Sequence, residues 1–169
     1  TVLESKDGFL PSSKEFVING TNADKNIALG KQCTNVVLQK DHNPNDALDG
    51  NMSTYWIADN EQFPQSLTVD LEEVCTLSGI QQIFKDHDSW KFKIEGSNDE
   101  LHWAVLVDNT DGISGFDFKT PVSGEFRYIR LTILGSAKGY WAHSCEFRVF
   151  GTEKDVVSLG DRELKDLAF

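Results

Sequence analysis

Short segments in which apolar and polar residues alternate constrain the fold of this chain more than any other feature. Alternation with a period of two is typical of strands that bury one face and expose the other. The clearest examples are SLTVDL (66–71), KFKIEG (91–96), EFRYIRLTIL (125–134) and EFRVF (146–150). Further candidates are NVVL (35–38), VCTLSGIQQIFK (74–85) and HWAVLV (102–107), and turn-rich stretches such as GSNDE and DNTDGISG separate the strands.

Helical patterns are almost absent before the last residues. NPNDALD (43–49) predicts one helical turn with Asn45 as its cap. Residues 1–26 contain one strand-like piece, EFVI, and residues 152–169 are charged. Many short strands with turn-rich connections predict an all-β sandwich with a flank at each end.

The composition allows a core and restricts the partners. Hydrophobic residues make up 39% of the 169 residues, which suits one domain. No segment approaches the ~18 consecutive apolar residues of a membrane span. The net charge is −11, from 16 basic and 27 acidic residues. An acidic surface argues against nucleic acid and anionic lipid as partners, and it suits calcium and neutral ligands.

Three cysteines, Cys33, Cys75 and Cys145, are too few and too far apart for a disulfide framework. Cys75 lies in an apolar segment, which predicts a buried free thiol. A bridge between Cys33 and Cys145, tying the first strand to the last, is the less favoured alternative. No Cys-x-x-Cys motif is present, so zinc and redox functions have no support.

The stretch DALDGNMSTYW (46–56) concentrates oxygen ligands beside two aromatic residues. Calcium binds six to eight oxygens, and this stretch offers Asp46, Asp49, Asn51, Ser53 and Thr54. The spacing is not that of an EF-hand. The residues alone fit a calcium loop and a solvated Asx turn equally well. Asn51 also starts a glycosylation sequon, which we discount because such motifs are frequent by chance.

The order of five motifs resembles a known family. These motifs are ALDGNMSTYW, PQSLTVDL, WKFKIEGSNDELHW, FRYIRLTILG and GYWAHSCEFRVFG. Together they resemble the coagulation-factor type C (discoidin) domain, and most of all the family-32 carbohydrate-binding modules of bacterial glycoside hydrolases. The resemblance covers about residues 27–151, which leaves flanks at 1–26 and 152–169. It implies a jelly-roll β-sandwich of two antiparallel sheets with a structural calcium ion.

The resemblance also implies a set of calcium ligands. Side chains would come from Asp49 and Glu146, further oxygens from Asn51 and Thr54, and backbone carbonyls from Asp46 and Cys145. Glu146 supports this set independently, because it leads into an apolar strand where an unpaired carboxylate is costly. Trp56, which follows the loop, is expected in the core.

Members of this family bind sugars in loops at one end of the sandwich. A sugar needs a flat aromatic ring for its apolar face and polar groups for its hydroxyls. Tyr140 and Trp141 follow a glycine in a loop and are expected to form the stacking surface, although Trp141 would alternatively anchor the loop. Trp90 alternates in step with Phe92 and Ile94, so it is expected in the core and would reach the site only with the edge of its ring. Trp103 is also expected in the core. The candidate ligand-binding residues are His42, Asp59, Asn60, Lys85, Asp86, His87, Trp90, Tyr140 and Trp141.

This chain departs from the galactose-binding pattern of the family. Those members often place a histidine and an aromatic residue where this chain has Ile57 and Asn60, and an arginine where it has Lys85. The ligand would then be another terminal sugar, such as mannose, glucose or an N-acetylhexosamine, or no sugar at all.

The expected function is that of a non-catalytic carbohydrate-binding module. It would target a linked glycoside hydrolase to glycans and act as a monomeric unit of a secreted bacterial enzyme. The alternatives are an adhesion domain for protein or lipid, and a structural spacer. Signature motifs of hydrolases and phosphate loops are absent from the sequence. A glycosidase carboxylate pair is the remaining catalytic alternative, because acidic residues are plentiful.

Overall fold

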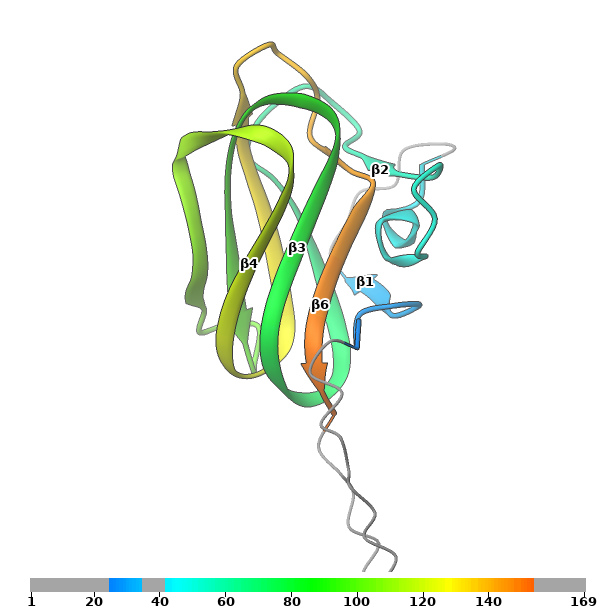
Figure 1. Cartoon of the computed structure of the whole chain (residues 1–169), viewed down its shortest axis with the longest axis vertical. Coiled ribbons are helices and arrows are strands. Elements are labelled where there is room, and N and C mark those ends of the chain that lie inside the picture. Colours follow the sequence, from blue (N-terminus) through cyan, green and yellow to red (C-terminus); the bar gives the residue numbers. More distant parts are fainter. Residues whose placement is uncertain (1–24, 35–41, 154–169) are drawn as a thin grey trace, which may run out of the picture.

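Seven elements make up the computed structural model, which describes residues 25–34 and 42–153 (Figure 1). In chain order they are β1 (Gln32–Thr34), the 3-10 helix η1 (Pro44–Leu48), β2 (Trp56–Ile57), β3 (Gln65–Ser97), β4 (Ala104–Ser136), β5 (His143–Ser144) and β6 (Glu146–Thr152). The two longest elements, β3 and β4, each turn back on themselves. Each therefore contributes several extended segments, which are called arms below. The protein is therefore all-β, as the alternating segments predict.

The arms form two antiparallel layers. One layer runs from β1 through residues 65–70 of β3 to residues 128–136 of β4, and then to residues 90–97 of β3 and the start of β4. The other layer places residues 76–83 of β3 between β6 and residues 117–125 of β4. Every pairing is antiparallel. This arrangement confirms the predicted discoidin-like sandwich.

Between the layers lies the hydrophobic core, which the alternation of the sequence predicts closely. The inward residues of the four clearest segments are at most 2% exposed: Leu67, Val69, Leu71, Phe92, Ile94, Ile129, Leu131, Ile133, Phe147 and Val149. Trp56 and Trp90 are in the same core, at 1% and 0% exposure. Each buried side chain of this size contributes about 1.5–3 kcal/mol to folding.

Trp103 does not lie in the core, so that prediction was wrong. The residue precedes β4, whose first residues, 104–109, lie at the edge of their layer and have residues 92–96 of β3 as their one neighbouring segment. The Trp103 ring is half-buried on the outer surface, where the Arg130 guanidinium lies 3.8 Å from its centroid. Its indole N–H donates to the backbone carbonyl of Glu100 at 3.0 Å. An edge arm has only one neighbour, so a large ring there meets solvent and a cation.

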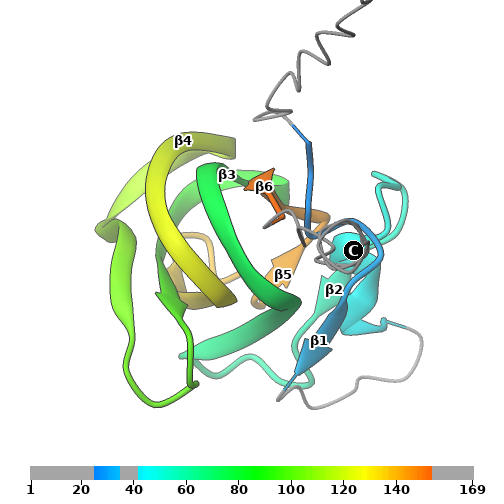
Figure 2. The same ribbon diagram turned by 90° about the horizontal axis from the view of Figure 1, so that it is seen from below.

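The predicted helical turn exists as η1, but its cap is Asn43 instead of Asn45. The Asn43 side chain accepts from the backbone N–H of Asn45 at 2.9 Å, and Asp46 accepts from the backbone N–H of Asn43 at 3.1 Å. Asn45 has another task, because its side-chain oxygen accepts from the backbone N–H of Cys33 at 2.8 Å. It therefore fastens η1 to β1. Figure 2 shows β1 and β2 on the same flank of the sandwich.

All three cysteines are free thiols. Cys75 is buried, as predicted, and burial raises the pKa of the half-buried Cys33 to about 12. The Cys33 thiol donates to the carbonyl oxygen of Pro44 at 3.6 Å. Both predicted strands NVVL and EFVI fall outside the described residues, as do nearly all residues of the two flanks.

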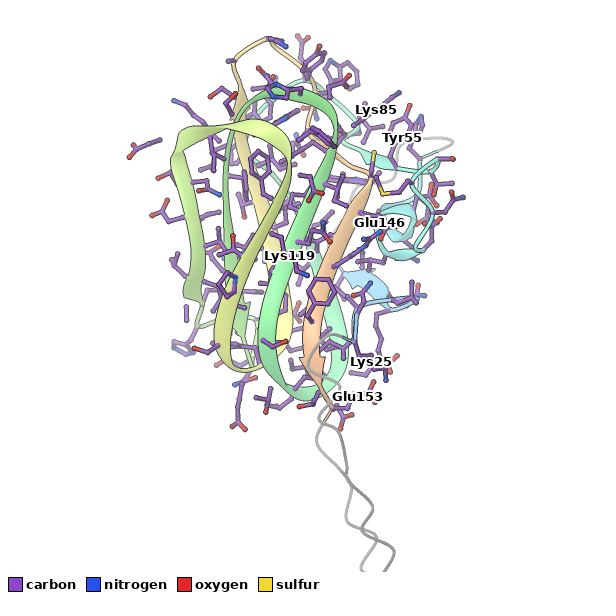
Figure 3. The ribbon with its side chains drawn as sticks, viewed as in Figure 1. Lys25, Tyr55, Lys85, Lys119, Glu146 and Glu153 are labelled. Atoms are coloured by element: carbon purple, nitrogen blue, oxygen red, sulfur yellow. The ribbon has the colours of Figure 1, made fainter. Side chains whose placement is uncertain are left out.

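The first and last described residues lie together at one end of the sandwich. Lys25 and Glu153 form an ion pair at 3.5 Å, and the backbone N–H of Gly151 donates to the carbonyl of Lys25 at 3.2 Å. Figure 3 shows this pair at the end opposite Tyr55 and Lys85. The loops that connect the arms at the far end are therefore remote from both points where the chain enters and leaves.

Candidate functional site

A pocket of about 430 Å³ opens at the end of the sandwich where Tyr55 and Lys85 lie (Figure 3). It is bounded by the turn of β3 near residue 85, by the start of β2 and by the segment between β4 and β5. Its walls combine the aromatic rings of two tyrosines and a tryptophan with lysine, aspartate and histidine side chains, which are able to form hydrogen bonds. The lining residues are Tyr55, Ile57, Lys85, Asp86, Gly139, Tyr140, Trp141 and His143.

Four of the residues predicted from the sequence meet in this pocket: Lys85, Asp86, Tyr140 and Trp141. Lys85 is exposed, and its Nζ atom lies 4.3 Å from the centroid of the Tyr55 ring. A cation held over an aromatic face keeps its N–H donors available to a ligand. One wall of the pocket thus offers a positive charge on an aromatic support.

His42 lies behind this wall. Its ring is 4.4 Å from the Tyr55 ring, and its Nδ1 atom is 3.2 Å from the Tyr55 carbonyl oxygen. His42 does not line the pocket, so the structure assigns it a contact with Tyr55 and its role as a sugar ligand stays a prediction.

Trp90 forms the support beneath the second wall. Its ring is fully buried, stacks on Phe84 with centroids 4.1 Å apart, and lies 6.2 Å from the Tyr140 ring in a nearly parallel arrangement. The indole N–H donates to the carbonyl of Asp86 at 3.0 Å. Trp90 therefore fixes both the Tyr140 ring and the 85–88 turn, and it acts on a ligand only through them.

Asp88 is a buried carboxylate that the list of candidate residues did not include. It accepts a hydrogen bond from the Ser136 hydroxyl and one from the backbone N–H of Lys138 at 3.0 Å. Burial raises its pKa, but hydrogen bonds from Ser136, Lys138 and Ser89 outweigh burial and leave the pKa below its ordinary value. Asp88 is two residues before Trp90 and lies on the same inward face of the strand. An acidic residue on an inward face indicates a carboxylate that is held by hydrogen bonds.

His143 is the second residue that the candidate list omitted. It is 4% exposed and packs edge-on against Trp90, with centroids 4.9 Å apart. Burial lowers its pKa, so the ring is neutral at pH 7. Its Nδ1 atom is 2.8 Å from the Trp141 carbonyl oxygen, whereas its Nε2 atom is buried and has no hydrogen-bond partner. A buried polar atom without a partner is uncommon and marks a place where a ligand atom is expected.

The remaining predicted ligand residues lie outside the pocket lining. The Asn60 side chain accepts from the backbone N–H of Gln62 at 2.8 Å and donates to Asp59 at 2.7 Å, which closes the 57–63 loop on itself. His87 is exposed, and its ring lies against Phe116 with centroids 6.5 Å apart. Their role in sugar binding therefore stays a prediction, with no support from the pocket geometry.

The acidic loop at 49–54 has Asx-type hydrogen bonds, one of the two alternatives that its residues allow. The Asp49 carboxylate accepts from the backbone N–H of Asn51 and from the Thr54 hydroxyl, both at 2.7 Å. The Oδ2 atom of the Asp46 side chain accepts from the backbone N–H of Asn43 in the η1 cap, so this oxygen is already used. Among residues 25–34 and 42–153, no cluster of three or more His, Cys, Asp or Glu side chains is arranged to hold a metal ion. A site here would combine at most two carboxylates with amide, hydroxyl and carbonyl oxygens.

Glu146 is fully buried beside this loop, at the start of β6 (Figure 3). One carboxylate oxygen accepts from Arg148 at 3.2 Å, and the other, Oε1, has no hydrogen-bond partner. Burial raises its pKa and the negative charge of Asp49 adds to the increase, and together they outweigh the opposing effects of Arg148 and the Gly50 backbone N–H. A buried carboxylate oxygen without a partner, next to a second carboxylate, is the environment that a divalent cation would relieve.

Comparison with solved structures places the fold among carbohydrate-binding modules. The fourth family-32 module of a family-89 glycoside hydrolase from Clostridium perfringens, solved with GlcNAc-α-1,4-galactose, matches with a TM-score of 0.69 and 24% identity, over 76% of this chain and 94% of that chain. The second chitosan-binding module of a Paenibacillus sp. chitosanase/glucanase, solved with chitotriose, matches with a TM-score of 0.68 and 23% identity, over 75% of this chain and all of that chain (100%). At these identities the likeness establishes the fold.

Sequence comparison identifies the family. No curated protein matches the chain. The sequence model of the F5/8 type C domain matches residues 31–147, which is more than half of the 169 residues and includes every residue of the pocket. The chain therefore belongs to the F5/8 type C domain family.

Proposed function

We propose that this chain is a non-catalytic carbohydrate-binding module and that the pocket between Tyr55 and Trp141 holds a terminal sugar. The observation that carries the proposal is the unpartnered Nε2 atom of His143 in a pocket with three aromatic rings. Sugars present apolar C–H faces together with hydroxyl donors, and this pocket offers surfaces for both. The two structural relatives described above were solved with saccharides, which supports the same class of ligand.

Each wall has a distinct task in this proposal. The Trp141 ring, half-buried at the pocket, stacks on the apolar face of the sugar. Tyr140 cannot move far because it packs on Trp90 and its backbone N–H donates to the Ser136 hydroxyl at 2.9 Å. Lys85 donates to ring or hydroxyl oxygens, and Asp86 accepts from hydroxyls. A site whose walls are held in place loses less entropy on binding.

The expected affinity is weak, with a dissociation constant of roughly 1 mM to 1 µM, because an open site competes with water for every hydroxyl. Weak binding is sufficient for a tethered module. A linked glycoside hydrolase would be kept at a high local concentration of its substrate. Such a role implies an extracellular location. Among the described residues, no helix has the length and hydropathy needed to cross a membrane.

A structural calcium ion is the second part of the proposal. The residues fit the ion, because Glu146 has a buried oxygen without a partner and lies close enough to Asp49 for the charges to interact. Side-chain oxygens would come from Asp49, Asn51, Thr54 and Glu146, and carbonyls from Asp46 and Cys145. The ion would neutralise the two carboxylates and fix the loop that leads into β2. The pocket begins at Tyr55, so this loop sets the position of one wall.

The first experiment is a glycan-array screen of the protein in the presence of calcium. We expect a cluster of hits that share one terminal sugar, and Trp141→Ala should abolish their binding with little loss of stability. Trp103→Ala is the matched control, because it removes an indole from the surface far from the pocket and should leave binding unchanged. Absence of any hit on arrays of mammalian, plant and microbial glycans would contradict the proposed function.

A further inference from the structure

The tautomer of His143 follows from one hydrogen bond. Its Nδ1 atom lies 2.8 Å from the carbonyl oxygen of Trp141. A carbonyl oxygen only accepts hydrogen bonds, so Nδ1 carries the proton and Nε2 carries a lone pair. The imidazole packs edge-on against the stacked rings of Phe84 and Trp90, with interplanar angles of 90° and 89°, so the surrounding core holds its orientation. Nε2 is therefore an obligate acceptor.

Asp86 is the polar side chain that faces this lone pair. Its Oδ2 atom lies 3.8 Å from Nε2 of His143, which is too long for a hydrogen bond. A carboxylate is also an acceptor without a proton to give. Two acceptors thus face each other at one side of the pocket, and neither satisfies the other. A group that satisfies both must bring its own donors.

We propose that His143 and Asp86 form an acceptor pair that selects sugars with two free hydrogen-bond donors on neighbouring ring carbons. This selection rests on the proposed function of the pocket and names its specificity-determining residues. The neighbouring donors are two hydroxyls, or one hydroxyl beside an amine. The shared requirement is that neither position is deoxygenated and that no hydroxyl of the pair is alkylated or acylated, because each change removes a donor.

The geometry gives the ligand a route to the buried atom. The Asp86 side chain is 39% exposed, so it can rotate toward solvent and admit a hydroxyl to Nε2. The Trp141 carbonyl holds Nδ1 during this movement, and Trp90 holds the backbone of Asp86 through its indole N–H. Lys85 lies on the Tyr55 side, where it is placed to donate to the remaining oxygens of the ring.

The ligand test uses a panel of methyl pyranosides of glucose, galactose, mannose and glucosamine, with calorimetry of each. For the sugar that binds best, we expect a loss of roughly 5- to 100-fold when either of two neighbouring donors is removed, because a buried acceptor then stays unpaired. Deoxy and O-methyl analogues must both lose affinity, since a purely steric effect would spare the deoxy sugar. Glucosamine tests the amine form of the pair. A sugar that binds but tolerates deoxygenation at every ring position would overturn the selection.

The protein test changes one acceptor into a donor. Asp86→Asn places an amide N–H₂ opposite the lone pair of His143 and lets the protein satisfy Nε2 itself. We expect binding to fall at least about tenfold while the melting temperature stays the same or rises. The matched control is Asp111→Asn, the same change at an exposed residue of β4 outside the pocket lining. Unchanged affinity in Asp86→Asn would overturn the role of the pair.

A third measurement requires no ligand. Long-range ¹H–¹⁵N correlation spectra of the imidazole rings distinguish a protonated from an unprotonated nitrogen. We expect His143 to show a protonated Nδ1 and an unprotonated Nε2, and the opposite tautomer would overturn the inference even if sugars bind. If no sugar of the panel or the arrays binds, the proposed function fails and the selection fails with it. If sugars bind but their donors are not discriminated, only the selection fails.

Discussion

The carboxylate of Asp88 accepts a hydrogen bond from the backbone N–H of Lys138 at 3.0 Å, across 50 residues of sequence. This contact joins the β3 turn that carries Lys85 and Asp86 to the loop that carries Tyr140 and Trp141. The Lys138 ammonium adds a second link, since it donates to the carbonyl of His87 at 2.8 Å. The two sides of the pocket are therefore held together by residues that do not line it.

Asp88→Ala is expected to weaken sugar binding although Asp88 does not line the pocket. The substitution leaves the Ser136 hydroxyl and the Lys138 N–H without their acceptor, which costs about 1–3 kcal/mol of stability. Urea unfolding and calorimetric titration measure the two effects. Asp108→Ala is the control, because Asp108 likewise accepts from Thr110 but is exposed. Equal binding by both variants would show that the loop positions do not depend on Asp88.

Removal of calcium is expected to lower the melting temperature. An ion that binds only the folded state stabilises it by about 4 kcal/mol at a thousandfold excess over its dissociation constant. Differential scanning calorimetry with and without a chelator measures the shift. Glu146→Gln should abolish the response, because it removes the charge of the buried carboxylate. If thorough chelation leaves the melting temperature unchanged and elemental analysis finds no metal, the proposed calcium site is contradicted.

The ion pair between Asp70 and Arg127 predicts a loss of stability in acid. Two hydrogen bonds from the Arg127 guanidinium, both 2.8 Å, hold the pKa of Asp70 below its ordinary value. A depressed folded-state pKa gives stability above the unfolded pKa, about 3.9, which is lost as the pH falls through the folded pKa. Arg127→Met should flatten this part of the pH profile of unfolding free energy. Lys91→Met, at an exposed position, is the control, and an unchanged slope in Arg127→Met would contradict the assignment.

Gly96→Ala is expected to destabilise the fold through overpacking. A Cβ atom at this position would lie 2.6 Å from Cγ of Phe126, a separation that real structures do not show. Overpacking of this kind costs about 1–3 kcal/mol. Gly135→Ala is the matched control, since its Cβ would meet only Lys91 at 3.8 Å. Denaturant midpoints of the two variants give the comparison, and equal midpoints would show that Phe126 moves aside without cost.

Local pattern was sufficient for most of the fold. The inward faces of the strands follow from parity alone, because a strand with one face in a core has to alternate. The alternation gave the wrong environment for Trp103, because it does not show whether a strand lies at the edge of a sheet. It also failed for the cap of η1, where Asn43 and Asn45 have the same chemistry and only the contact of Asn45 with β1 separates them.

The site was predictable to a smaller extent. Residue type, together with the loops in which members of the resembling family bind sugars, put forward Lys85, Asp86, Tyr140 and Trp141, and these four lie in one pocket. His143 and Asp88 were missed because their significance depends on partners far along the chain. The lone pair of His143 becomes notable only when Asp86, 57 positions earlier, is found 3.8 Å away. Distances between loops are set by how the layers close, and no local pattern contains them.

The meeting of Lys25 and Glu153 has a mechanical consequence. Because the described chain enters and leaves at the same point, a force that pulls on both ends acts first on that ion pair and on the bridge between Asn26 and Phe150. When two neighbouring antiparallel segments are pulled apart from one end, their hydrogen bonds break one after another. The rest of the sandwich bears no force until the hydrogen bonds between β6 and β3 begin to break. Fraying would therefore begin at the end opposite the pocket, and the walls around Tyr55 and Lys85 would keep their shape while the terminal segments yield (Figure 3).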